Sequence, residues 1–484
     1  MDIKTQLPPE PAIHHLPVEV LQEIFHKVAQ RSKTIRHIRL TCRYWRDLVA
    51  SDKTLPRRIA MQSEMREIER AYPYSEARDY YAHDIDGLAR ALVYIQDANF
   101  ELYMQLHKPL FPRDKESENG TEEVVPWDRF EMQCTSLTIP WAHSSLKQSL
   151  LQFIGYLPTL ENLNSLSVMR TNVLPSIMQH IPPSPTRLRS LTLLPGAGPV
   201  GDMELYPLIR PVLKGLRTFK VSGSNRGLSV TFLKALLSSF ESLEELIFDR
   251  GPNLTKEEVD LIRQSVNRNL QPRMLKIYTT MLPMFPISLL RGLIDLSLYH
   301  PFNQQDVKSD DPKVYLPQLT TLSLERSNTG LSLFETPNLK EIYLRFTRWN
   351  DRTDRAQLLY PVLVHITDRD PSMASFLLDP PLPNISELHI HGDFLRECSI
   401  PEVLSRCLSG QTSLFPNLQR LIVRMRFSKR EEFEHFEREL LGVTSSCTQL
   451  ISVRYSWVTR EGRESKIQHT KAGTFPYEMQ SKPE

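Results

Sequence analysis

One short apolar phrase, L-x-x-L-x-L, recurs along most of the chain and constrains its fold more than any other feature. The best copies start at Leu163, Leu188, Leu216, Leu243, Leu293, Leu319, Leu339, Ile385, Leu418 and Leu450. The first four starts are 25, 28 and 27 residues apart, and later neighbours are separated by 26, 20, 33 and 32 residues. Weaker copies start at Cys134, Pro272 and Pro361. A period of this length predicts a fold built from stacked copies of one small unit.

The spacing within the phrase predicts the structure of each copy. Its last two apolar positions are two residues apart, so on a strand they point to the same side, into the core. The segment of residues 231–242 carries apolar residues at helical spacing and predicts an outer helix. The pattern is typical of leucine-rich repeats, an α/β fold in which successive strands form a curved parallel sheet. The alternative is an ordinary α/β domain rich in leucine.

The same register predicts which strand residues face the concave side of that sheet. For the copy at Leu319, it buries Leu322 and Leu324 and turns Thr321, Ser323 and Glu325 outward. It places Glu245, Asp249 and Asp295 on the middle of this surface and basic residues near its C-terminal end. The basic residues, which we predict to bind substrate, are Arg345, His389, His391, Arg420, Arg424 and Arg454. Clustered arginines grip carboxylate or phosphate groups, which predicts an acidic or phosphorylated substrate segment. The alternative is that these side chains are only solvated.

A G-x-G-x-x-G sequence formed by Gly196, Gly198 and Gly201 follows the Leu188 copy and raises the question of a dinucleotide cofactor. Pro199 lacks the backbone N–H that a phosphate-binding turn would supply. The next predicted strand ends near Ser222 with no acidic residue to bind a ribose. We therefore predict no cofactor.

Composition narrows the class of protein. The chain has 484 residues with 59 Lys and Arg against 57 Asp and Glu, which gives no general reason to expect nucleic acid or an anionic membrane as partner. The five cysteines form no C-x-x-C motif. This pattern is typical of free thiols in a reducing compartment. No secretory signal or membrane-spanning run is visible, so the sequence predicts a cytoplasmic or nuclear protein, or one found in both.

A compact helical module precedes the repeats. Residues 16–25 read LPVEVLQEIF and residues 41–48 read TCRYWRDL. The two stretches resemble the two halves of an F-box, with Thr41 in place of the usual Val and Leu55–Pro56 in place of a trailing Leu-Trp. By this resemblance we assign residues 12–58 to an F-box. Its core and adaptor-binding residues would be Leu16, Pro17, Val20, Leu21, Ile24, Phe25, Leu40, Cys42, Trp45 and Leu48.

The resemblance implies binding rather than catalysis. F-box proteins are substrate receptors of SCF-type cullin–RING ubiquitin ligases, in which the F-box docks on the adaptor subunit, and through it on the cullin, while the repeats bind the target protein. A repeat scaffold with no ubiquitin role is the alternative function, and a self-contained helical cap is the alternative for the module. The basic residues of positions 31–46 also allow a nucleic-acid-binding helix, which the near-zero net charge argues against.

Other motifs do not favour an enzyme. His389, His391 and Asp393 resemble the start of a metallo-hydrolase motif, but Phe394 replaces its closing histidine, so we predict no metal site and no catalytic residue. Residues 59–124 are predicted to form a helical connector with a flexible acidic loop at 113–123. The repeats then occupy residues 125–459, and residues 460–484 are predicted to be a polar tail.

Overall fold

The structure is a computed structural model in which strands and helices alternate through much of the first 300 residues and strands follow one another in the described residues from β10 (Asp295–Tyr299) to β17 (Arg420–Arg426). It describes residues 57–62, 80–82, 84–95, 99–105, 110, 125–139, 146–169, 171–182, 187–193, 202–221, 228–248, 254–299, 314–325, 334–345, 363–368, 384–392, 417–426, 430–445, 452–458, 464–470 and 473–476. The chain divides into two compact units, Met1–Leu216 and Arg217–Glu484. The boundary falls inside the repeated region, so copies of the phrase contribute to both units.

Unit 1 contains a parallel sheet with the strand order β2, β1, β3, β4, β5, β6. Its strands are β1 (Arg57–Gln62), β2 (Tyr80–Ala82), β3 (Phe100–Gln105), β4 (Cys134–Ile139), β5 (Ser165–Val168) and β6 (Ser190–Leu193). Its helices are α5 (Ile85–Ile95), α6 (Asp128–Gln133), α7 (Lys147–Tyr156), α8 (Leu174–Met178) and α9 (Asp202–Leu213), with a 3-10 turn, η4, at Thr171–Val173.

Unit 2 contains a parallel sheet of ten strands. In order these are β7 (Thr218–Val221), β8 (Glu245–Phe248), β9 (Met274–Tyr278), β10 (Asp295–Tyr299), β12 (Thr321–Glu325), β14 (Glu341–Arg345), β15 (Leu363–Asp368), β16 (Glu387–Gly392), β17 (Arg420–Arg426) and β18 (Ser452–Val458). Two antiparallel strands, β19 (Glu464–Thr470) and β20 (Gly473–Pro476), extend it beyond β18. The short strands β11 (Val314–Tyr315) and β13 (Phe334–Glu335) pair with each other.

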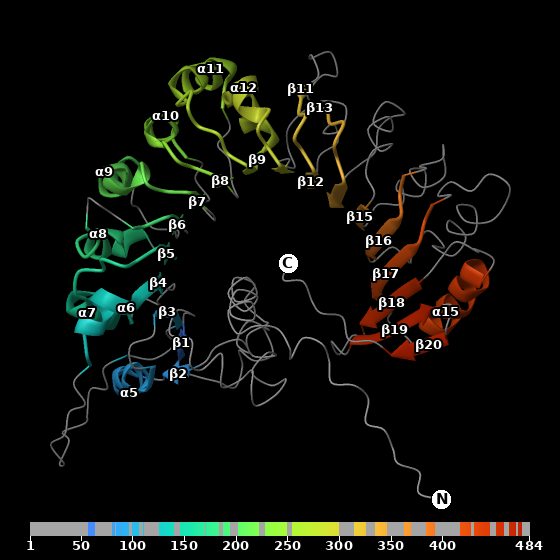
Figure 1. The fold of residues 1–484 in the computed structure, drawn as a ribbon, viewed down its shortest axis with the longest axis horizontal. Helices are drawn as coiled ribbons and strands as arrows, with labels where there is room; N and C mark the ends of the chain where they lie inside the picture. Colours follow the sequence, from blue (N-terminus) through green and yellow to red (C-terminus); the bar gives the residue numbers. More distant parts are fainter. Residues whose placement is uncertain are drawn as a thin grey trace, which may run out of the picture. The chain divides into compact units, whose positions relative to one another are not determined.

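The helices of unit 2 are α10 (Val230–Ser239), α11 (Lys256–Ser265), α12 (Ile287–Leu290) and α15 (Arg430–Ser445), with a 3-10 helix, η5, at Thr279–Met284. Helices α10, α11 and α12 lie along one side of the strands β7–β10 (Figure 1). Helix α10 begins at Ser229, whose side chain accepts a hydrogen bond from the Phe232 N–H. Helix α11 begins with a capping box formed by Thr255 and Glu258. These caps fix where each helix starts relative to the preceding strand.

The repeated phrase forms the core, as its spacing predicts. Leu319, Leu322 and Leu324 are at most 2% exposed, and Thr321, Ser323 and Glu325 between them are half-buried on the other side of β12. The same alternation of buried and half-buried residues holds in β5, β6, β7, β8, β9 and β10. Full burial of a leucine-sized side chain contributes about 1.5–3 kcal/mol, so each buried position of the phrase stabilises the sheet. The predicted strand register is confirmed.

The structure differs from the predicted helical connector. Residues 57–62 and 100–105 form strands β1 and β3, whereas α5 is the part of the described connector that agrees with the helical prediction. Ile59 and Met61 are both buried, as are Phe100, Leu102 and Met104, so burial in these segments repeats every two residues. Packing in the sheet therefore overrides the helical tendency of the local sequence.

The predicted polar tail also differs, because it contains β19 and β20. Strand β18 would otherwise leave its backbone N–H and C=O groups unpaired at the edge of the sheet, and β19 satisfies them by antiparallel pairing. The F-box segment up to residue 56, the predicted acidic loop at 113–123, and the glycines Gly196, Gly198 and Gly201 lie outside the described residues.

Cys134 illustrates the cysteine chemistry of the described chain. It is a buried free thiol at the start of β4, and burial raises its pKa well above the ordinary range. A thiol held protonated in this way is a structural residue rather than a nucleophile.

Candidate functional site

The face of the unit 2 sheet opposite α10, α11 and α12, here called the open face, carries most of the predicted substrate-binding residues. The first strand residue that points to this face has the same register in each strand. This first row consists of Thr218, Glu245, Met274, Asp295, Thr321, Glu341, Leu363, Glu387, Arg420 and Ser452. Carboxylates thus stand on alternate strands, about 9–10 Å apart at the usual strand spacing.

Glu387 is the centre of the best-defined polar cluster on the open face. Its carboxylate is only 12% exposed, and one oxygen lies 2.6 Å from Nε2 of His389. The other oxygen pairs with the guanidinium of Arg420, whose side chain is 59% exposed. We call Glu387, His389 and Arg420 the Glu387 cluster. A nearly buried carboxylate needs such partners, since an unpaired charge at this depth would be costly.

The Glu387 cluster changes the interpretation of two predicted substrate-binding residues. His389 and Arg420 were expected to offer positive charge to an acidic ligand, but both contact the carboxylate of Glu387. Glu387 was not part of the prediction, although it occupies the first-row position of the phrase at Ile385 and could have been found there. An internal carboxylate therefore offsets the charge that was assigned to substrate binding.

The other four predicted residues are placed only by their backbones. Arg345, His391 and Arg424 occupy one register row, with Thr367 of β15 between the first two, and His391 lies directly opposite Arg424. Arg454 of β18 lies opposite Ile422 of β17. The side chains of Arg345, His391, Arg424 and Arg454 lie outside the described residues. The backbone register brings three of the four into one row.

The middle of the open face is acidic only in part. Glu245 and Asp295 are half-buried there, as expected, while Asp249 lies outside the described residues. Lys276 shares this region and lies 5.1 Å from the ring centroid of Tyr299, which in turn packs on Tyr278 with ring centroids 5.9 Å apart. The expected acidic middle is therefore a mixed surface in which a lysine lies among the carboxylates.

The carboxyl group of Asp295 lies in the field of its charged neighbours on the open face. Burial raises the pKa of Asp295, Lys276 opposes the shift, and Glu341 and Glu245 add to it. Tyr343 donates a hydrogen bond to Glu341 at 3.1 Å. Burial, with the added charge of Glu341, raises the pKa of Tyr343 to about 12. The row therefore produces a negative field, and the repulsion within it disfavours ionisation of Asp295.

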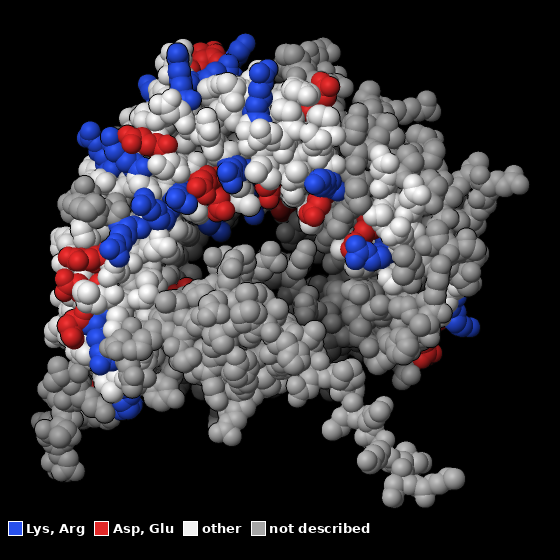
Figure 2. Space-filling model, in the orientation of Figure 1, with Lys and Arg blue, Asp and Glu red and all other residues white. Residues whose placement is uncertain are grey.

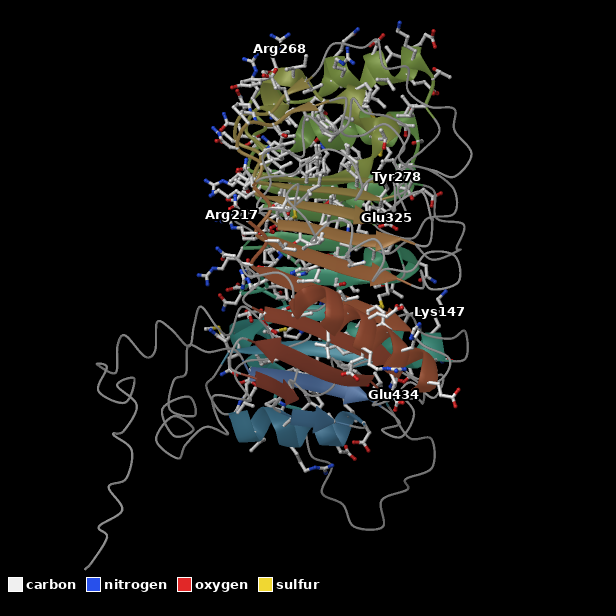
Figure 3. All side chains as sticks on the ribbon, turned by 90° about the vertical axis from the view of Figure 1, so that its right-hand side faces the viewer. Lys147, Arg217, Arg268, Tyr278, Glu325 and Glu434 are labelled. Atoms are coloured by element: carbon white, nitrogen blue, oxygen red, sulfur yellow. The ribbon has the colours of Figure 1, made fainter. Side chains whose placement is uncertain are left out.

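The two ends of the strands in unit 2 carry different side chains. Arg217 lies at the edge where the strands begin, whereas Tyr278 and Glu325 lie toward the opposite edge (Figure 3). Arg217 pairs with Glu244 at 3.5 Å, and both side chains are largely exposed. Figure 2 shows basic and acidic side chains intermixed over the strands β8–β14. Exposed pairs of this kind contribute little stability and leave the surface close to neutral.

The described parts of the chain contain no candidate for a metal site or for a membrane-spanning helix. Across those ranges, no group of three or more His, Cys, Asp or Glu side chains is arranged to hold a metal ion. Asp393 of the motif that starts at His389 lies outside them. None of the described helices is both long and apolar enough to cross a bilayer.

Comparison with known families identifies the N-terminal segment. Residues 13–62 match the family model of an F-box-like domain. Domains of this kind generally bind the adaptor subunit of SCF complexes, and the match suggests this role here. The matched range includes all ten predicted adaptor-binding residues, which lie outside the described residues, and ends with strand β1. No curated protein matches the chain.

Proposed function

We propose that this protein is a substrate-recognition subunit of an SCF-type cullin–RING ubiquitin ligase. The observation that carries the proposal is the F-box-like match at residues 13–62, followed along the chain by a long parallel sheet built from one repeated phrase. In this role the F-box docks on the adaptor, and the repeats, of leucine-rich type, hold the target protein. The chain itself acts by binding and supplies no catalytic group.

The sheet supports a binding role because it presents a rigid polar surface. Core leucines fix each strand from below, so the side chains of the open face keep constant spacing without being needed for folding. Repeat folds bind partners through such extended surfaces. The half-buried Glu, Asp, Lys and Tyr residues of β8–β14 are suited to contact with a polar protein surface.

The test of the adaptor role is an affinity pulldown with the wild-type chain and with a double variant, Leu16→Ala with Pro17→Ala. The wild-type chain should co-purify adaptor and cullin in near-stoichiometric amounts. Two lost anchors of the F-box should weaken adaptor binding by about tenfold or more, because a buried leucine contributes roughly 1.5–3 kcal/mol.

A matched control comes from the repeats. Thr321→Asp changes the open face and should leave adaptor binding intact, since the F-box does not contain Thr321. Full adaptor recovery with the double variant would show that the F-box assignment is wrong. A wild-type chain that recovers other proteins but neither adaptor nor cullin would be a scaffold with no ubiquitin role.

A further inference from the structure

A groove of about 590 Å³, lined by six polar side chains and by Met132, lies in unit 1 at the edge where successive strands begin. We call it the entry groove. Asn99 directly precedes β3, Thr135 is the second residue of β4, Asn162 and Asn164 precede β5, and Arg187 and Arg189 precede β6. Because these strands are neighbours in one parallel sheet, residues far apart in sequence line the groove in strand order. The groove is therefore a product of the repeat geometry.

Backbone hydrogen bonds hold the lining of the entry groove in place. The Asn164 N–H donates to the Thr135 carbonyl at 2.8 Å, and the Arg189 N–H donates to the Asn164 carbonyl at 2.8 Å. Leu163 and Leu188, each adjacent to a lining residue, are at most 1% exposed. The lining side chains thus project from a scaffold that the core fixes from below, which is the arrangement a preformed binding site needs.

The two arginines of the groove are oriented by neutral partners. Arg187 donates to the side-chain oxygen of Asn162, whose own Nδ2 donates to the Met132 carbonyl at 2.9 Å. Arg189 donates to the Gly215 carbonyl at 2.8 Å. A guanidinium has five N–H donors, so these bonds position each group while leaving donors for a ligand. No carboxylate is among the residues that line the groove, and within the described residues neither guanidinium forms an ion pair.

The corresponding arginine of unit 2 shows that this is not a general property of the repeats. Arg217 directly precedes β7, as Arg189 precedes β6, but its guanidinium pairs with the carboxylate of Glu244. The position in the repeat is the same and the partner is different. Within the described residues, the charge of Arg189 is therefore not offset as that of Arg217 is, although both residues hold the same place in the repeat.

The asparagine side chains of the groove indicate what kind of molecule bears the anionic group. Asn99, Asn162 and Asn164 offer both donors and acceptors, which suits the main chain of a peptide. The starts of four neighbouring strands span roughly 14 Å, the length of about four extended residues. We infer that the entry groove binds a short acidic segment of a partner protein, with Arg187 and Arg189 holding its carboxylate or phosphate groups. The inference rests on the proposed function in that this partner is the target protein.

The test is fluorescence anisotropy on the purified full-length chain with short labelled peptides. One peptide carries consecutive glutamates, a second carries phosphoserines in the same frame, and a third carries lysines. Both anionic peptides should bind more tightly than the lysine peptide, and their affinity should fall as salt is added. Tighter binding of the glutamate peptide would identify carboxylate as the ligand, and tighter binding of the phosphoserine peptide would identify phosphate.

Charge reversal assigns the site. Arg187→Glu with Arg189→Glu should weaken the anionic peptides by about tenfold or more, because several charge-assisted hydrogen bonds are lost. The matched control, Arg217→Glu, should stay within about twofold of the wild type, since Arg217 lies outside the groove. Arg187→Gln with Arg189→Gln removes the charge with a smaller change in the surface. It should also weaken binding, and it replaces the reversal if that variant does not fold.

Three results would overturn the inference. The first is a lysine peptide that binds as tightly as the anionic ones, and the second is an Arg217→Glu variant that weakens binding as much as the groove variants. The third is inorganic phosphate that displaces the peptides as effectively as unlabelled peptide does, because the groove would then bind a free anion. Failure of the adaptor pulldown would remove the ligase role while leaving peptide binding in place, so the two proposals fail separately.

Discussion

The entry groove of unit 1 and the Glu387 cluster of unit 2 both contain arginine, and they differ in what holds it. In the groove, the acceptors are the amide oxygen of Asn162 and the carbonyl of Gly215, which carry no charge. In the cluster, the acceptor for Arg420 is a carboxylate, and His389 contacts the same group. A count of basic residues therefore does not say where an anion can bind, because the partner of each cation decides whether its charge is available.

The two regions also differ in what an anionic ligand must displace in order to bind. An anionic ligand that approached Arg420 would compete with Glu387, whose side chain is 12% exposed and already pairs with the guanidinium. The arginine side chain is 59% exposed, so solvent screens the pair, but the ligand must still displace an internal carboxylate to gain the full charge of the arginine. A ligand in the entry groove meets no carboxylate among the described lining residues that it must displace, and it can leave the positioning bonds of Arg187 and Arg189 in place. The arginines of the groove are held in position without being neutralised, and this favours anion binding there.

The largest expected effect tests whether the two regions are separable. Leu322→Asp places a carboxylate in the core of unit 2, where Leu322 is fully buried. The loss of leucine packing and the unpaired charge should lower the free energy of unfolding of unit 2 by about 3–5 kcal/mol or more. Peptide binding in the entry groove should persist, since the substitution lies in the other unit. Thermal unfolding and peptide anisotropy measure the two effects.

The control for this variant is its neighbour in the chain. Thr321→Asp adds the same charge on the open face, opposite Asp295 and Glu341, and should lower the free energy of unfolding by about 0.5–2 kcal/mol through repulsion, which is less than the loss caused by Leu322→Asp. Equal losses of stability for the two variants would contradict the strand register. Loss of peptide binding with Leu322→Asp alone would show that the two regions depend on each other.

The sequence predicts the core of this molecule well because the phrase reports burial directly. Each apolar position of the phrase at Leu319 is buried, as its spacing requires. The predictions differ from the structure at both ends of the repeats, where segments such as Arg57–Gln62 and Glu464–Thr470 form strands. Those strands are selected by pairing with a neighbouring strand, which a local reading of helical or polar character does not contain.

The candidate sites are predicted less well, since their chemistry depends on neighbours from other repeats. Arg420 and Glu387 are 33 residues apart, and only the pairing of β16 with β17 brings them together. The entry groove has the same origin, because its residues come from four successive strand starts. Aligning the copies of the phrase by register would have placed Glu387 beside Arg420, so part of this information was present in the spacing.

A second prediction concerns removal of the internal carboxylate. Glu387→Ala should release Arg420 from its ion pair on the open face and lower the stability of unit 2 by about 1–2 kcal/mol, since Arg420 is largely solvated. In the background of Arg187→Glu with Arg189→Glu, the added substitution should restore measurable binding of the glutamate peptide. Anisotropy and thermal unfolding measure the two results. The Glu387 cluster of the variant would then contain an arginine that Glu387 no longer neutralises, as the entry groove contains arginines held by uncharged acceptors.

The control for this gain of binding is Glu341→Ala. Glu341 accepts a hydrogen bond from Tyr343, so its removal leaves the contacts of Glu387 with Arg420 and His389 in place. This variant should not restore peptide binding. If Glu387→Ala also fails to do so while remaining folded, neutralisation by Glu387 is not what separates the cluster from the groove.

The smallest expected effect concerns Asp295, whose neighbours on the open face are other carboxylates. Its pKa is raised in the folded chain by burial, with Lys276 opposing and Glu341 and Glu245 adding to the shift. The folded state therefore holds this proton more tightly than the unfolded state, where Asp titrates at about 3.9. The corresponding stability is fully present below that pH and is lost as the pH rises through the folded pKa.

Asp295→Asn removes the titrating group while keeping its shape, and the result should depend on pH. At neutral pH the variant should be more stable than the wild type, by no more than about 1 kcal/mol because the side chain is only half-buried. Below the ordinary pKa of aspartate, the two melting temperatures should converge. Lys276→Met is the opposing control, since removal of the cation that lowers the pKa of Asp295 should reduce stability at neutral pH. If Asp295→Asn is less stable than the wild type at neutral pH, attraction between Asp295 and Lys276 outweighs the cost of burial and the repulsion by Glu341 and Glu245. The charges of the first row would then stabilise the folded state instead of destabilising it.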